Sequence, residues 1–220
     1  MPPALLALRS RFPNWQPQPA AELVSTGIAQ LDALTGGLPR GSIAEICGPP
    51  SSGRTSLALA IAAAATGRRE ICAWVDTSDT FDPATAAAAG VELDQLLWIR
   101  CGGRPPAALA AADQVLHAGG FGLTVLDLGD LAPRLVRRIP LTSWFRFHRA
   151  VERTPAVLVV LAPEPCAGSC SSLSLDLKKP RAIWTGGPGP GRLLRGLVVE
   201  AHPRKPARGE SARFEARAAG

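Results

Sequence analysis

The segment GPPSSGRTS, residues 48–56, has the glycine spacing of a phosphate-binding loop. An apolar run, Ser42–Cys47, comes directly before it, and a helix-forming run, Thr55–Thr66, follows. A strand that leads through a glycine-rich loop into a helix is the context in which this pattern has physical meaning. The N–H groups of the loop then face one point, to which the positive end of the helix adds its partial charge. The sequence therefore predicts a strand-loop-helix unit that cradles an anion.

The alternation of apolar strands and helices continues to about residue 161. The predicted strands are Ile71–Asp76, Leu96–Arg100, Leu123–Asp127 and Ala156–Leu161, and the predicted helices are Pro83–Gly90, Ala107–Ala118 and Leu141–Arg153. This alternation predicts an α/β fold, with a mostly parallel sheet and helices on both faces. Three further strands are predicted between Pro/Gly-rich turns, at Leu173–Leu177, Gly196–Ala201 and Arg213–Arg217. We expect these C-terminal strands to be antiparallel and to extend one edge of the sheet.

The length of 220 residues suffices for one substantial core, so a single domain is expected. Residues 1–24 are proline-rich and predict an N-terminal arm, residues 25–217 predict the core domain, and residues 218–220 predict a frayed tail. No apolar run reaches the roughly 20 residues that a membrane span needs. The N-terminus has no basic region ahead of its apolar residues. We therefore expect a cytoplasmic protein with no membrane contact.

The loop supplies the predicted nucleotide contacts, but Arg54 stands where a phosphate loop normally has lysine. Arginine keeps the charge, while its planar fork on a longer stem has a different geometry. Thr55 is placed to offer a hydroxyl to Mg²⁺, and Asp127 ends an apolar strand, as expected of a residue that holds the Mg²⁺ shell. The candidate nucleotide-binding residues are Gly48, Pro49, Pro50, Ser51, Ser52, Gly53, Arg54, Thr55, Ser56 and Asp82. Asp82 is equally interpreted as a helix N-cap, because Pro83 follows it.

The chain is basic, with a formal net charge of +6 and a pI of about 9.6. Positive charge is concentrated in residues 134–153, where Glu152 is the only acid. The candidate DNA or partner contacts in this segment are Arg134, Arg137, Arg138, Arg146 and Arg149. A solvated, arginine-rich surface is the alternative interpretation. Trp144, Phe145 and Phe147 lie among these arginines and fit either base stacking or the buried face of a helix.

Two longer runs carry a family resemblance. The runs TGIAQLDALTGGLPRGSIAEICGPPSSGRTS, residues 26–56, and CAWVDTSDTFDPATAAAAGVELDQLLW, residues 72–98, resemble the corresponding segments of the RecA recombinases. The resemblance covers residues 25–130 clearly and the C-terminal strands loosely. It implies a RecA-like P-loop NTPase core, with ATP and Mg²⁺ as cofactors and DNA as a partner. His202 and Arg204 match the pair of lysines that reach a neighbouring subunit's nucleotide in that family, which makes Arg204 a further candidate contact.

The chain departs from the RecA recombinases at residues that serve ATP hydrolysis. Ser78 stands where the family has the catalytic Glu that activates water, and the adjacent Asp79 is expected to point elsewhere. Thr85 replaces the aromatic residue that stacks on adenine, and Ala162-Pro163 replaces the Asn-Gln sensor. Together with Arg54, these changes predict a degenerate ATP site. No catalytic residue is assigned, and the changes argue against productive use of ATP and Mg²⁺.

This pattern of losses is similar to that of the ImuA family, RecA-like accessory proteins of damage-induced mutagenesis. The resemblance implies a non-enzymatic role in the DNA damage (SOS) response and error-prone translesion synthesis. The implied partners are a Y-family-like polymerase homologue, an error-prone DNA polymerase and RecA, with DNA as a further contact. Two alternatives stay open. One is an active DNA-dependent ATPase or recombinase of the RecA type, with Arg54 and Asp79 in altered roles. The other is an ATP-independent regulator of oligomerisation or cell division.

Overall fold

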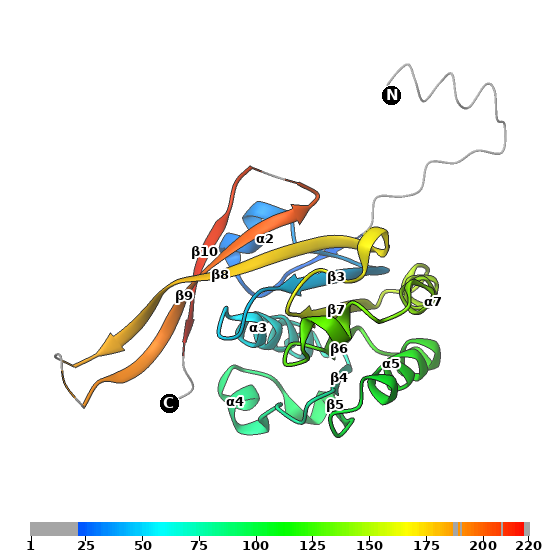
Figure 1. Cartoon of the computed structure of the whole chain (residues 1–220), viewed down its shortest axis with the longest axis horizontal. Helices are drawn as coiled ribbons and strands as arrows, with labels where there is room; N and C mark the ends of the chain where they lie inside the picture. Colours follow the sequence, from blue (N-terminus) through cyan, green and yellow to red (C-terminus); the bar gives the residue numbers. More distant parts are fainter. Residues whose placement is uncertain (1–21, 187–188, 190, 208, 218–220) are drawn as a thin grey trace, which may run out of the picture.

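The computed structural model describes residues 22–186, 189, 191–207 and 209–217, which form a twisted sheet with helices on both faces (Figure 1). Most of the predicted arm, residues 1–21, and the predicted tail, residues 218–220, lie outside the described residues. The strands are β1 (Leu23–Val24), β2 (Leu38–Pro39), β3 (Ser42–Cys47), β4 (Cys72–Asp76), β5 (Leu96–Arg100), β6 (Leu123–Asp127), β7 (Val157–Ala162), β8 (Ser171–Thr185), β9 (Leu193–Lys205) and β10 (Ala212–Arg217). The helices are α2 (Ala29–Thr35), α3 (Arg54–Gly67), α4 (Pro83–Ala88), α5 (Pro105–Ala118), α6 (Pro133–Val136) and α7 (Leu141–Val151), with short 3-10 turns η1 (Leu93–Gln95) and η2 (Gly168–Cys170).

Eight strands form the main sheet in the order β10-β9-β8-β3-β7-β6-β4-β5. All pairs from β8 to β5 are parallel, whereas β9 pairs antiparallel with both β8 and β10. The central strands β3, β4, β6 and β7 are buried along their whole length, which explains why their sequences are mostly apolar. Because these strands are parallel, their carboxyl ends meet at one edge of the sheet. The register places Asp76 opposite Asp127 there.

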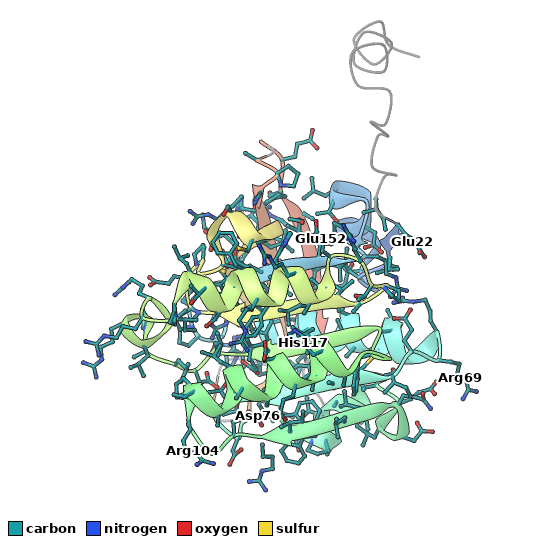
Figure 2. The ribbon with its side chains drawn as sticks, turned by 90° about the vertical axis from the view of Figure 1, so that its right-hand side faces the viewer. Glu22, Arg69, Asp76, Arg104, His117 and Glu152 are labelled. Atoms are coloured by element: carbon teal, nitrogen blue, oxygen red, sulfur yellow. The ribbon has the colours of Figure 1, made fainter. Side chains whose placement is uncertain are left out.

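Two helical layers cover the sheet. Helices α2, α3 and α4 pack on one face with side chains such as Leu31, Leu57 and Ala86. Helices α5, α6 and α7 pack on the other face with Ala112, Val136 and Trp144, among others. Figure 2 looks onto this second face, where α5 and α7 lie side by side. Among the described helices, none is long and apolar enough to cross a membrane.

The C-terminal strands build a hairpin that leaves the body of the molecule. The inner part of β8 pairs with β3, and its outer part pairs only with β9. Figure 1 shows the outer part extending away from the sheet at the lower left. The sequence prediction of antiparallel C-terminal strands at one sheet edge is confirmed. Both strands of the hairpin are longer than the predicted Leu173–Leu177 and Gly196–Ala201, because cross-strand pairing continues beyond the apolar cores of these segments.

Other element boundaries differ by a few residues. Helix α7 ends at Val151, two residues before the predicted end, where the Thr154 N–H donates to the Val151 carbonyl and closes a turn before Pro155. Helix α6 and the two-stranded β1-β2 sheet were not predicted. Leu23 and Val24 of the expected arm pair with β2, and Val24 belongs to the buried core. The structured core therefore begins at least two residues before position 25.

Candidate phosphate site and basic surfaces

The glycine-rich loop lies between β3 and α3, and its backbone includes conformations that favour glycine. The Gly48 N–H donates to the Ala162 carbonyl at 3.3 Å, and the Ser52 N–H donates to the Pro49 carbonyl at 3.2 Å. Gly53 has φ +96°, a left-handed conformation that favours glycine. A β-carbon added there would lie 2.5 Å from Cγ2 of Val199 on β9. The loop is therefore held from one side by the C-terminal strands.

Arg54, the first residue of α3, is buried beside the loop. Its guanidinium lies against Gly129, since a β-carbon on that glycine would be 3.3 Å from Arg54 Cζ. Burial lowers the pKa of Arg54, and the nearby carboxylates of Asp127 and Asp130 partly oppose that shift. Within the described part of the chain, Arg54 Nη1 is buried with no hydrogen-bond partner. The arginine thus presents an unsatisfied donor next to the predicted anion cradle.

The two predicted Mg²⁺ ligands lie at the same edge of the sheet. Thr55 is exposed in the first turn of α3. Asp127 ends β6, where its Oδ1 accepts a hydrogen bond of 2.9 Å from the Gly129 N–H. Burial raises the pKa of Asp127 to about 6, although that hydrogen bond and the attraction of Arg54 both act in the opposite direction. The ionised form of Asp127 is therefore less favourable in the folded protein than in water.

The segment after β4 contains Ser78, which stands at the position where the RecA recombinases have the catalytic Glu. Ser78 is half-buried, and its hydroxyl cannot serve as a general base in the way a carboxylate does. Asp79 has φ +57°, and its carboxylate pairs with Arg100 at 3.3 Å. Asp76 is fully buried and accepts hydrogen bonds from the Thr80 N–H, the Phe81 N–H and Trp98 Nε1. The carboxylates of this segment thus have structural partners.

Thr85, at the predicted adenine-stacking position, lines a groove of about 370 Å³ together with residues that include Ser56 and Phe214. Asp82 caps α4, accepting from the Thr85 N–H at 3.0 Å and from the Thr85 hydroxyl at 2.5 Å. These hydrogen bonds lower the pKa of Asp82. The N-cap interpretation of Asp82 is confirmed, and its predicted contact with a nucleotide stays a prediction. Thr85, at the adenine-stacking position, is engaged by the same cap.

The arginines predicted to contact DNA or a partner differ in whether they form ion pairs within the chain. Arg137 pairs with Glu164 at 2.6 Å, and Arg146 pairs with Asp113. The remaining candidates are exposed and have no ion pair within the described residues: Arg134, Arg138, Arg149 and Arg204. Arg204, on β9, is near enough to the carboxyl end of β3 to oppose the rise in the pKa of Cys47, which burial takes to about 12. The α6 to α7 segment is thus partly neutralised from within the chain.

The aromatic residues of α7 divide between the two interpretations. Trp144 and Phe147 are fully buried in the core under this helix, with their rings edge to face. Phe145 is 52% exposed. Base stacking by Trp144 or Phe147 is therefore excluded in this fold, and the helical-core interpretation holds for both.

Sequence reasoning missed two acids near the predicted site. Asp130, exposed after β6, is close enough to influence the pKa values of both Arg54 and Asp127. Glu45 is buried on β3, and its Oε1 accepts from the Cys166 and Ala167 N–H groups at 2.7 Å each. An acid inside the apolar run SIAEIC was the signal for Glu45, because a buried charge requires specific partners. It fixes the turn after β7, where the resemblance places the sensor.

A parallel sheet with a glycine-rich loop after β3 and an acid at the end of β6 defines the class of α/β proteins that carry a phosphate loop. Comparison with known families identifies the family within this class. The RecA N-terminal domain matches residues 14–136, more than half of the chain, and the chain belongs to this family. The resemblance to RecA recombinases is confirmed at this level, as is the α/β RecA-like fold.

The relatives match only part of their own length. Protein RecA of Paramagnetospirillum magneticum is 43% identical over 119 residues, which are 51% of this chain and 32% of that protein. Protein RecA of Synechocystis sp. is 40% identical over 119 residues, covering 53% of this chain and 33% of that protein. The crystal structure of the RadB recombinase has a TM-score of 0.64 at 20% identity, covering 88% of this chain and 96% of that one. The matched region thus spans about a third of these RecA proteins, and the RadB likeness shows the fold.

Proposed function

We propose that this chain is a RecA-like accessory protein of DNA repair that acts by binding rather than by a cycle of ATP hydrolysis. Its proposed setting is the DNA damage (SOS) response and error-prone translesion synthesis, as the resemblance to the ImuA family implies. The proposed partners are a Y-family-like polymerase homologue, an error-prone DNA polymerase and RecA, with DNA as a further contact. Such a role places the protein in the cytoplasm.

The segment after β4 carries this proposal. A hydrolytic site needs a base within hydrogen-bond reach of the attacking water. Ser78 provides none, and the adjacent Asp79 is paired with Arg100. Asp76 is committed to three donors and is fully buried. The residues at the expected position of the base therefore favour binding without turnover.

The cradle itself still fits phosphates and Mg²⁺. The unpaired, buried Arg54 Nη1 is a donor that an anionic phosphate would satisfy. Thr55 and Asp127 are oxygen donors of the kind that Mg²⁺ prefers. If ATP and Mg²⁺ bind, we assign the phosphates to the loop residues 48–56 and the metal to Thr55 and Asp127, and the metal would neutralise phosphate charge. We propose a weak nucleotide site of this kind, which influences conformation.

One observation favours the second candidate, an active DNA-dependent ATPase of the RecA type. Asp130 is exposed and close to Arg54 and Asp127. An exposed carboxylate at this edge of the sheet is the residue type that activates water. The two candidates therefore make opposite predictions for turnover, and Asp130 is the residue that separates them.

We expect the purified chain to release no phosphate from ATP above background, with or without single-stranded DNA. A variant carrying Arg54→Lys and Ser78→Glu restores the usual lysine and a carboxylate at the position of the base. We expect its phosphate release to be at least tenfold above background, since a positioned general base contributes roughly 100-fold or more. Phosphate release is measured together with nucleotide binding by calorimetry, so that binding without turnover is recognised.

The matched control adds Asp127→Ala to the double variant, which removes the proposed metal ligand and should return phosphate release to background. DNA-stimulated turnover by the native chain that disappears in Asp130→Asn would contradict the accessory proposal and support the active ATPase. Turnover that survives Asp130→Asn would also contradict the proposal, because it would require a base that the structure does not place near the loop.

A further inference from the structure

The outer part of the β8-β9 hairpin, here called the distal hairpin, comprises residues 178–185 and 192–197. Figure 1 shows it projecting from the sheet, with neither helical layer packed against it. Its strands pair antiparallel, with Ala182 opposite Leu197 and Trp184 opposite Leu194. The register shifts between Ile183 and Trp184, so that Arg195 has no partner on β8. A bulge of this kind twists a ribbon and redirects side chains.

The distal hairpin is positively charged without internal compensation. Its cations are Lys178, Lys179, Arg181, Arg192 and Arg195, and the sequence has no acidic residue from Lys178 to Val199. All five are exposed, and none forms an ion pair with a carboxylate of the described chain. The arginines of α6 and α7 differ, because Arg137 and Arg146 are paired internally. Every cation of the distal hairpin is therefore free of an ion pair, whereas two of the arginines of α6 and α7 are not.

The same surface carries an exposed aromatic ring. Trp184 is 47% exposed, although tryptophan normally buries most of its area. The Arg192 guanidinium lies over the indole, 5.3 Å from its centroid, which favours one orientation of the ring. Leu194, directly opposite Trp184, is also exposed and widens the apolar surface beside the ring. An aromatic surface flanked by free cations matches the chemistry of an unpaired base and its phosphates.

We propose that the distal hairpin binds single-stranded nucleic acid, with a base stacked on Trp184 and phosphates on Arg181, Arg192 and Arg195. The flat indole favours a single strand, because the bases of a duplex are already stacked on one another. The surplus of positive charge favours a polyanion over an apolar protein surface. This inference depends on the hairpin alone and does not require the proposed function, because it involves no residue of the phosphate site.

The test measures binding of a fluorescent 25-nucleotide thymidine oligomer to the full chain by anisotropy at several salt concentrations. We expect Trp184→Leu to weaken binding about tenfold, as loss of one stacked base does, and Trp184→Phe to retain most of it. The double variant Arg192→Ala, Arg195→Ala should reduce the slope of log affinity against log salt by about 1.4, the value for two phosphate contacts on a single strand.

The matched control removes the same charge elsewhere, with Arg69→Ala and Arg104→Ala, which lie in the segments after α3 and before α5 (Figure 2). It should change affinity less than twofold. Thermal unfolding of each variant verifies the fold. Three results would overturn the proposal: no binding by the native chain, equal binding by Trp184→Leu, or tighter binding to a duplex of the same length. If Trp184→Leu abolished self-association of the protein and left binding of the thymidine oligomer unchanged, the hairpin would instead be assigned to contact with a second copy of the chain.

Discussion

Asp76→Ala is expected to lower the free energy of unfolding by about 3 kcal/mol or more, because each donor left unsatisfied costs roughly 1–3 kcal/mol. The Asp76 carboxylate is fully buried and accepts from two backbone N–H groups and from Trp98 Nε1. Alanine leaves all three donors without an acceptor and opens a void under the segment after β4. Because that segment contains Ser78, the same change should loosen the edge of the phosphate site.

Urea unfolding followed by tryptophan fluorescence measures this effect. Asp76→Asn should lose less, because its amide keeps one acceptor oxygen. Asp94→Ala is a matched control at an exposed acid of η1 and should change the free energy of unfolding by less than about 0.5 kcal/mol. A loss below about 1 kcal/mol in Asp76→Ala would mean that water replaces the carboxylate, and that the three hydrogen bonds do not anchor the segment.

Asp127→Asn is expected to raise the free energy of unfolding at pH 7 by about 3 kcal/mol, before any loss from its altered contacts. Burial raises the pKa of Asp127 from 3.8 to about 6. A carboxyl group whose pKa is higher in the folded state makes its full contribution to the free energy of unfolding only below the pKa that it has in the unfolded state. That contribution is lost as the pH rises through about 6, so the native chain should lose stability between about pH 4 and 6. Asparagine removes the charge and keeps an acceptor for the Gly129 N–H.

The measurement is the difference between the unfolding free energies of Asp127→Asn and the native chain at pH 4, 5, 6 and 7. We expect the difference to increase with pH and to level off above about pH 6. Asp94→Asn controls for the loss of one negative charge at an exposed site and should show a flat difference. A flat difference for Asp127→Asn would mean that Arg54 or solvent compensates the buried carboxylate fully.

The sequence was sufficient to predict the parallel core, because its strands are mostly apolar and separated by helix and turn signals. Strands β3, β5 and β6 have the predicted ends, and the loop and Asp127 meet as expected from parallel strands. The distal hairpin was not predicted, since its strands are held by pairing with each other and lack a buried face. Likewise, the environment of Arg54 includes Gly129 and Asp130, some 75 residues away, and no local pattern records such a contact.

The phosphate loop packs closely against the C-terminal strands, and this packing limits which substitutions the loop can accept. A β-carbon at Gly53 would collide with Val199, and one at Gly48 would lie 2.6 Å from the Leu177 carbonyl oxygen. Loop positions 48 and 53 therefore depend on the residues of β8 and β9 that pack against them, whereas the Arg54 guanidinium lies against Gly129. Lysine can therefore be introduced at position 54 without changing these contacts, but a loop transplanted from a relative with different spacing would require a matching C-terminal sheet.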